Sequence, residues 1–106
     1  MTERKMYKKL VRDKIPQIIE RHGKTLSVCL VDPHTLKDYA VKKLQEEIAE
    51  FIENPCAEEA ADILEVLDFI CYHEGIKERA IRAQKISKYA TKGGFEKGYI
   101  LEWVEE

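Results

Sequence analysis

The sequence predicts an all-α fold, a small helical bundle built around a central antiparallel helix hairpin. Two short motifs mark helix starts, Asp32-Pro33 and Asn54-Pro55, because Asp or Asn caps a helix and proline fits its first turn. After each start, apolar residues recur every three or four positions, which is the period of an amphipathic helix. The length of 106 residues suits one domain, which we expect to span residues 1–106.

The first helix is expected to begin with Asp13 as its N-cap and Pro16 in its first turn. It should end near Gly23, since glycine commonly follows the last helical residue. Residues 25–31 contain β-branched side chains but have no evident pairing strand elsewhere in the chain. We therefore expect this segment to be extended without forming a sheet.

The hairpin is expected to consist of two helices separated by Asn54-Pro55. The first runs from Asp32 to about Glu53, and the second ends at Gly75. Apolar residues with helical spacing support the two helices: Ala40, Leu44, Ile48, Phe51 and Ile52 in the first, and Ile63, Leu64, Leu67 and Ile70 in the second.

A further helix is expected over about residues 77–90, before Gly93-Gly94. The tail that follows, residues 95–104, is rich in aromatic residues and is predicted to lie across the bundle. For Phe95, Tyr99 and Trp103 we favour packing on the helices over stacking on a nucleotide base.

Charge is distributed unevenly along the chain. The net charge is −2, but residues 45–74 hold ten acidic and no basic side chains, whereas residues 1–44 hold eleven basic and five acidic ones. Residues 75–106 hold seven basic and five acidic side chains. Because like charges repel, the acids of residues 45–74 must face water, be covered by the basic ends, or bind cations.

Composition also disfavours several classes of protein. No apolar stretch is long enough to span a bilayer, and no apolar signal segment follows the lysine-rich start. We therefore expect a cytoplasmic protein that binds no membrane. A nucleic-acid partner is disfavoured because the net charge is negative and the basic residues are spread over both ends. The three cysteines contain no C-x-x-C pair, so we expect buried reduced thiols at Cys29, Cys56 and Cys71.

Four acids of the predicted hairpin are expected to meet. Glu47 and Glu50 lie three residues apart in the first helix, and Glu59 and Asp62 lie three residues apart in the second. In an antiparallel hairpin that turns at Asn54-Pro55, Glu50 faces Glu59. By the same register, Glu47 faces Asp62. The two layers are about 4.5 Å apart along the axis, so four carboxylates converge on one small volume.

A divalent cation would neutralise such a cluster. Partly desolvated carboxylates repel one another strongly, and residues 45–74 hold no Lys or Arg that could compensate them. Oxygen ligands without Cys or His favour Mg²⁺, or Mn²⁺, over zinc. The alternative is a solvated acidic helix face with no bound ion.

Three motifs follow one another along the chain: KLVRDKIP at residues 9–16, EEIAE with EAAD at residues 46–50 and 59–62, and KGGFE at residues 92–96. The acidic motif resembles the EExxE…ExxD signature of the MazG-like, all-α nucleoside triphosphate pyrophosphatases. The flanking motifs resemble more narrowly its phosphoribosyl-ATP pyrophosphohydrolase-like, or house-cleaning, branch. The resemblance spans residues 7–102, and the ordered set of motifs is more specific than the acidic motif alone.

This resemblance implies an all-α bundle that assembles as a homodimer or homotetramer. It implies that Mg²⁺, with Mn²⁺ possible, is bound by acids matching Glu47, Glu50, Glu59 and Asp62. The implied reaction cleaves a nucleoside triphosphate between its α and β phosphates, giving a nucleoside monophosphate and pyrophosphate. Only eight residues separate Glu50 from Glu59, fewer than in many MazG proteins. We therefore expect a smaller pocket, or one completed by another subunit.

Other steps of this reaction have candidate residues too. Glu46 is a candidate for orienting or deprotonating the attacking water, although a solvated surface role is equally open to it. The leaving pyrophosphate needs cationic groups, and the basic residues in or beside the flanking motifs are Arg12, Lys14, Lys88 and Lys92.

Two other functions remain open from the sequence. One is hydrolysis of phosphoribosyl-ATP in histidine biosynthesis. The other is a non-catalytic interaction module, a helical oligomer whose acidic groove binds a basic partner or a structural cation.

Overall fold

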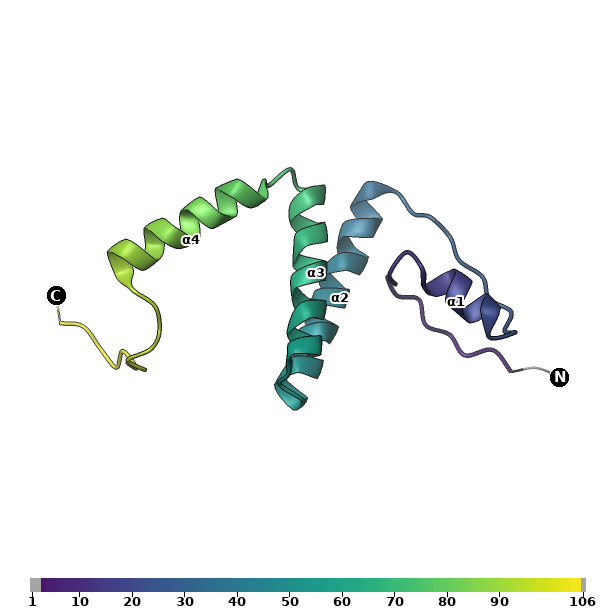
Figure 1. The fold of residues 1–106 in the computed structure, drawn as a ribbon, viewed down its shortest axis with the longest axis horizontal. Coiled ribbons are helices and arrows are strands. Elements are labelled where there is room, and N and C mark those ends of the chain that lie inside the picture. Colours follow the sequence, from purple (N-terminus) through teal and green to yellow (C-terminus); the bar gives the residue numbers. More distant parts are fainter. Residues whose placement is uncertain (1–2, 106) are drawn as a thin grey trace.

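The structure, a computed structural model, describes residues 3–105, and these form four helices and no strand (Figure 1). The all-α prediction is therefore confirmed. The helices are α1 (Ile15–Arg21), α2 (Pro33–Glu53), α3 (Ala57–His73) and α4 (Glu78–Lys92). Helices α2 and α3 lie side by side as the central hairpin, while α1 and α4 lie on opposite sides of it.

The start of α2 agrees with the prediction. Asp32 has extended backbone angles and is the N-cap, and Pro33 is the first helical residue. One carboxylate oxygen of Asp32 accepts a hydrogen bond from the Thr35 backbone N–H, and the other accepts one from the Thr35 hydroxyl, both at 2.9 Å. The backbone and hydroxyl donors of Thr35 lower the pKa of Asp32, so this cap is charged at neutral pH.

The predicted start of the next helix is wrong by two residues. Asn54 is the C-cap of α2, because its backbone N–H still donates to the Glu50 carbonyl at 2.9 Å. Helix α3 begins at Ala57 instead, with Cys56 as its N-cap. The Asn-Pro pair therefore ends one helix and forms the turn between the two.

The predicted N-cap of α1 is also displaced. Lys14, and not Asp13, is the N-cap, and no side chain caps this helix. A turn closed by a 3.0 Å hydrogen bond from the Ile15 N–H to the Arg12 carbonyl precedes α1. This turn takes up Asp13, so the helix starts one residue later than the sequence pattern indicates.

The core lies in the hairpin. Ala40 is 1% exposed and Glu47 is 6% exposed, and both lie in α2. The open end of the hairpin is tied by a 2.8 Å ion pair between Lys37 and Glu74. The three cysteines are free, as expected, but Cys29 is exposed because it lies in the extended segment between α1 and α2. Cys56 and Cys71 are half-buried, so the expectation of buried thiols is wrong for all three cysteines.

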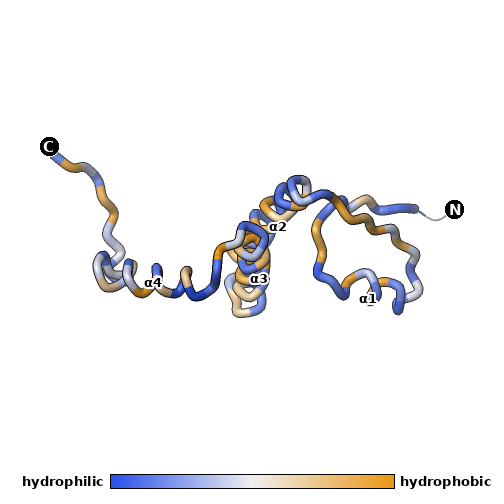
Figure 2. Tube along the Cα trace, turned by 90° about the horizontal axis from the view of Figure 1, so that it is seen from above, coloured by the Kyte–Doolittle hydropathy of each residue, from blue (hydrophilic) through white to orange (hydrophobic). Residues whose placement is uncertain are grey.

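The tail does not lie across the bundle. Phe95, Tyr99 and Trp103 are 98%, 84% and 73% exposed, and the chain after α4 extends away from the hairpin (Figure 1). The prediction is wrong because α4 itself leaves the hairpin and carries the tail with it. Apolar residues occur along this tail and along the segment between α1 and α2 (Figure 2).

The single chain is elongated. Its radius of gyration is 19.0 Å and its principal extents are 67 × 31 × 27 Å, whereas a compact domain of this length has a radius of gyration of about 13 Å. Within residues 3–105, no helix combines the length and the apolar character that crossing a membrane requires.

Candidate metal centre

Three of the four predicted acidic ligands meet in the hairpin. Glu47, Glu50 and Glu59 each place one carboxylate oxygen within 4.8 Å of the other two. Glu47 and Glu50 lie one turn apart on α2, and Glu59 lies in the first turn of α3. The short turn at residues 54–56 brings these two helix segments together, so the cluster follows directly from the antiparallel hairpin.

Two oxygens of this cluster are buried without a partner. Glu47 Oε2 and Glu59 Oε2 have almost no accessible surface and accept no hydrogen bond from the described residues. A buried carboxylate oxygen without a donor is costly, because it has lost its water and gained nothing in return. A cation between the two helices would satisfy both oxygens at once.

The pKa of Glu50 reflects the same crowding of carboxylates. The negative charge of Glu47 is the main cause that raises the pKa of Glu50, with partial desolvation, hydrogen bonding to Glu47 and the charge of Glu59 adding to it. The ionised form of this carboxylate is therefore disfavoured by its neighbours. A bound cation would reverse that balance, since it favours the ionised form.

The spacing of the oxygens fits a hard divalent cation. Ligands on opposite sides of one Mg²⁺ are about 4.2 Å apart, twice the metal–oxygen distance, and on Ca²⁺ they are up to about 5 Å apart. The three oxygens of Glu47, Glu50 and Glu59 lie within 4.8 Å of one another, so small side-chain movements would let them share one such cation. The residues present could thus hold a metal ion.

Lysines also form ion pairs with these acids. These pairs were not predicted from the sequence. Lys43 Nζ lies 3.1 Å from Glu47 Oε1 and 3.5 Å from Glu46 Oε1. Burial lowers the pKa of Lys43, but its hydrogen bond to Glu47 and the charges of Glu46 and Glu47 outweigh this and raise it. Lys43 compensates one oxygen of Glu47 and leaves the other free. The i, i+4 spacing of Lys43 and Glu47 in the sequence is the pattern that could have predicted this ion pair.

Glu46, the candidate for activating water, lies at the edge of the cluster. Its Oε1 accepts a hydrogen bond from Lys9 at 3.3 Å as well as pairing with Lys43. Two lysines therefore hold this carboxylate in place. Lys9 comes from the N-terminal segment, so the first motif of the sequence contacts the acidic one.

Asp62, the fourth predicted ligand, lies outside the group of three. Its Oδ1 accepts a hydrogen bond from the Arg12 guanidinium at 2.7 Å, and a second nitrogen of Arg12 lies 3.9 Å from Glu65. Asp62 lies one turn beyond Glu59 on α3. Arg12 therefore competes with a metal ion for the Oδ1 atom of Asp62.

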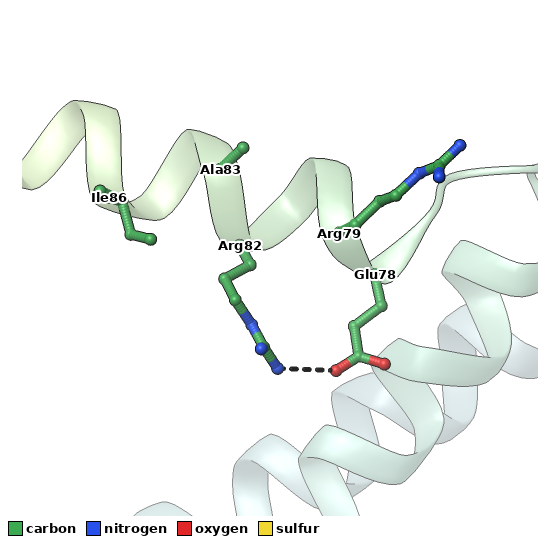
Figure 3. A pocket seen from close by; sticks show the side chains of 5 residues that line it. All are labelled: Glu78, Arg79, Arg82, Ala83 and Ile86. Carbon is green, nitrogen blue, oxygen red and sulfur yellow. Dashed lines mark hydrogen bonds and ion pairs between the residues drawn. The ribbon is translucent and has the colours of Figure 1, made fainter.

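The structure places the four predicted phosphate-binding residues differently. Arg12 lies at the acidic cluster through its bond to Asp62, and Lys14 caps α1 two residues later. Lys88 and Lys92 belong to α4, on the other side of the hairpin (Figure 1). One chain therefore does not bring the two basic groups together. Two shallow hollows of the surface lie on α4, and one of them is lined by Glu78, Arg79, Arg82, Ala83 and Ile86 (Figure 3).

Comparison with family models, curated proteins and solved structures finds no match for this chain.

Proposed function

We propose that this protein is a Mg²⁺-dependent nucleoside triphosphate pyrophosphohydrolase of the MazG-like kind that acts on the nucleotide pool. The observation that carries the proposal is the convergence of Glu47, Glu50 and Glu59 with two buried, unpartnered oxygens. The motifs before and after the acidic one support the choice of reaction, since their basic residues suit a polyphosphate. Mn²⁺ is the alternative ion.

The reaction adds water across the phosphoanhydride between the α and β phosphates and yields a nucleoside monophosphate and pyrophosphate. A bound divalent cation supplies neutralisation of the charge on the phosphate oxygens. Glu47, Glu50 and Glu59 would hold it, and Asp62 would join them once Arg12 turns to the substrate. Arg12 suits a phosphate because its planar guanidinium donates several hydrogen bonds.

In the proposed reaction, Glu46 orients the attacking water. Lys9 and Lys43 hold its carboxylate, and Lys43 pairs with Glu47 as well, so Glu46 lies next to the proposed ligands. Lys14 is assigned with Arg12 to the leaving phosphates, since both lie in the same short segment. Lys88 and Lys92 receive no role within one chain.

The test is an incubation of the full chain with a panel of canonical and modified nucleoside triphosphates, with Mg²⁺ or with a chelator. Chromatography should show a nucleoside monophosphate and pyrophosphate, formed only when the metal is present. Diphosphate with orthophosphate would overturn cleavage between α and β. No turnover on any triphosphate would overturn the proposal and leave phosphoribosyl-ATP hydrolysis or a metal-stabilised interaction module.

Conservative variants test the residues. Glu47→Gln should abolish metal-dependent turnover with helical content unchanged, because it removes a ligand charge at nearly constant shape. Asp62→Asn should do the same if Asp62 completes the ligand set. The control is Asp68→Asn, an exposed acid in the middle of α3, which should keep full activity. Full activity of Glu47→Gln would refute the assignment of the site.

A further inference from the structure

Lys43 is more enclosed than the lysine beside it. Its side chain is 16% exposed, whereas Lys42 is an exposed residue. Enclosing a lysine costs free energy, because the ammonium group loses water and the long side chain loses rotamer freedom. The contacts of the ammonium group therefore have to account for its position.

One ammonium group joins two neighbouring carboxylates. Lys43 Nζ lies 3.1 Å from Glu47 Oε1 and 3.5 Å from Glu46 Oε1. The two acids follow Lys43 in α2 at i+4 and i+3, so the helix itself brings the three side chains together. Within the described residues, Lys43 is the cation that pairs with Glu47, whereas Glu46 also pairs with Lys9.

The contact with Lys43 decides which oxygen of Glu47 stays free. The carboxylate of a glutamate turns readily about its last bond, since that torsion has only a broad, two-fold preference. Pairing of Oε1 with Lys43 restricts this rotation. The other oxygen, Oε2, is buried and accepts no hydrogen bond from the described residues. Glu47 therefore offers a cation one oxygen in a fixed place, and it does so within the cluster that Glu50 and Glu59 complete.

Two opposite effects of Lys43 on a bound cation follow from this arrangement. Its positive charge repels a cation, so Coulomb forces alone predict that removing Lys43 strengthens metal binding. Its hold on Glu47 favours the cation, since removing a group that orients a metal ligand lowers metal affinity roughly 10- to 100-fold in other proteins. Because Glu46 and Glu47 already neutralise the ammonium group, we expect the repulsion to be the smaller effect.

The other basic residues near the cluster lack this position. Lys9 and Arg12 pair with acids outside the group of three. Their side chains are 38% and 55% exposed, so water surrounds them more than it surrounds Lys43. The orientation of Glu47 therefore depends on Lys43.

We propose that Lys43 is a positioning residue of the metal site, which holds Glu47 by Oε1 and so presents Oε2 to a divalent cation. The inference rests on the metal site of the proposed function, and it is independent of which nucleotide is cleaved and at which bond. Metal binding in the absence of nucleotide is therefore the measurement that tests it.

The experiment is isothermal titration calorimetry of the full chain with Mg²⁺ alone. It compares the wild type with Lys43→Met and with a matched control, Lys42→Met, which removes the same charge from an exposed position of α2. Lys43→Met should raise the Mg²⁺ dissociation constant roughly tenfold. Lys42→Met should change it by less than about twofold, because salt screens an exposed charge. Circular dichroism checks that both variants keep their helical content.

Three outcomes would overturn the proposal. Unchanged or tighter Mg²⁺ binding by Lys43→Met would mean that the ammonium group acts on the cation through repulsion alone. An equal loss of affinity in Lys42→Met would mean that the contact with Glu47 is not the cause. A wild type that binds no Mg²⁺ would refute the metal site itself, and with it the proposed function.

A second variant, Lys43→Gln, separates position from charge. Its amide can still donate a hydrogen bond to Glu47 but carries no charge, so its Mg²⁺ affinity should lie between those of the wild type and Lys43→Met. Equal affinities of the two variants would show that the charge alone acts, and would overturn the proposal. If Lys43→Met does not fold, Lys43→Gln decides by itself: weaker binding than the wild type supports the proposal, and equal or tighter binding overturns it.

Discussion

At the scale of single residues, the acids of the hairpin are not equivalent. Glu47 is buried and already paired with Lys43, Asp62 is paired with Arg12, and Glu50 has only other carboxylates around it within the cluster. The ionised form of Glu50 is therefore disfavoured by its neighbours when no cation is bound, and removing this carboxylate tests that repulsion.

We predict that Glu50→Gln raises the melting temperature of the metal-free protein at pH 7. The pKa of Glu50 is raised above its ordinary 4.5, so the charged form destabilises the fold at neutral pH, and a neutral amide relieves the repulsion from Glu47 and Glu59. With Mg²⁺ present the order should reverse, because the variant has lost a ligand. Thermal melts with chelator and with Mg²⁺ measure both effects.

The control for this prediction is Asp68→Asn, which removes one negative charge outside the cluster. It should change neither the metal-free melting temperature nor the shift that Mg²⁺ causes. A Glu50→Gln variant that melts lower than wild type in chelator would show that the carboxylates are compensated without a metal.

At the scale of elements, the hairpin is held by close packing near its middle and an ion pair at its open end. Ala40 on α2 is 1% exposed, so the space beside its methyl group is filled. Ala49 lies on the opposite side of the same helix, nine residues later, and is exposed. The two alanines allow the same substitution to be compared in a packed and in an open place.

We predict that Ala40→Leu lowers the free energy of unfolding by about 1–3 kcal/mol, because a larger side chain in a filled core forces its neighbours to shift. Ala49→Leu should change it little, since that position can accept extra atoms. Urea denaturation followed by circular dichroism measures both. Equal losses in the two variants would contradict close packing around Ala40.

The ion pair at the open end should make stability depend on pH. Lys37 donates to Glu74 and lowers the pKa of Glu74 below its ordinary 4.5, while Glu74 raises the pKa of Lys37. Because the pKa of Glu74 is lowered in the folded state, its ionised carboxylate stabilises the fold at pH values above the unfolded-state pKa of Glu74. This stabilisation is lost as the pH falls through the folded-state pKa. Because the pKa of Lys37 is raised, Lys37 stays charged at neutral pH and still stabilises the fold through this ion pair.

We predict that Glu74→Gln lowers the melting temperature at pH 7 and that its difference from wild type disappears at a pH below the lowered pKa of Glu74. Adding Lys37→Gln to Glu74→Gln at pH 7 should cost little more, because the partner is already lost. A difference from wild type that persists in acid would mean that Glu74 acts through packing and not through its charge.

At the scale of the whole molecule, one chain leaves a large surface exposed. Besides α4, the tail and the segment between α1 and α2 carry exposed apolar residues (Figure 2). A protein whose second copy covers such surfaces gains stability from association, so its unfolding depends on mass action.

We predict that the melting temperature of the wild type rises with protein concentration and that added salt reduces this rise. The rise follows from association coupled to folding, and the salt effect from screening between basic α4 and the acidic hairpin. Differential scanning calorimetry over a hundredfold range of concentration measures it. A melting temperature that does not change with concentration would contradict association through these surfaces.

The sequence by itself determined the helices and the central acidic cluster. Helix positions follow from local rules, namely the Asp32 cap, the apolar period and the glycines that end helices. The meeting of Glu50 and Glu59 also follows, because a short turn between two helices leaves only an antiparallel register. Both are consequences of interactions over a few residues.

The tertiary structure alone decided which charges pair and where the ends of the chain lie. Arg12 bonds to Asp62 across 50 positions and Lys9 bonds to Glu46 across 37 positions. Both bonds depend on how the N-terminal segment folds back, which no local pattern encodes. The outward course of α4 was equally hidden, because it depends on a cap at Gly75 whose exit direction a sequence does not display. Contacts between distant residues are set by the balance of packing and charge over the whole chain.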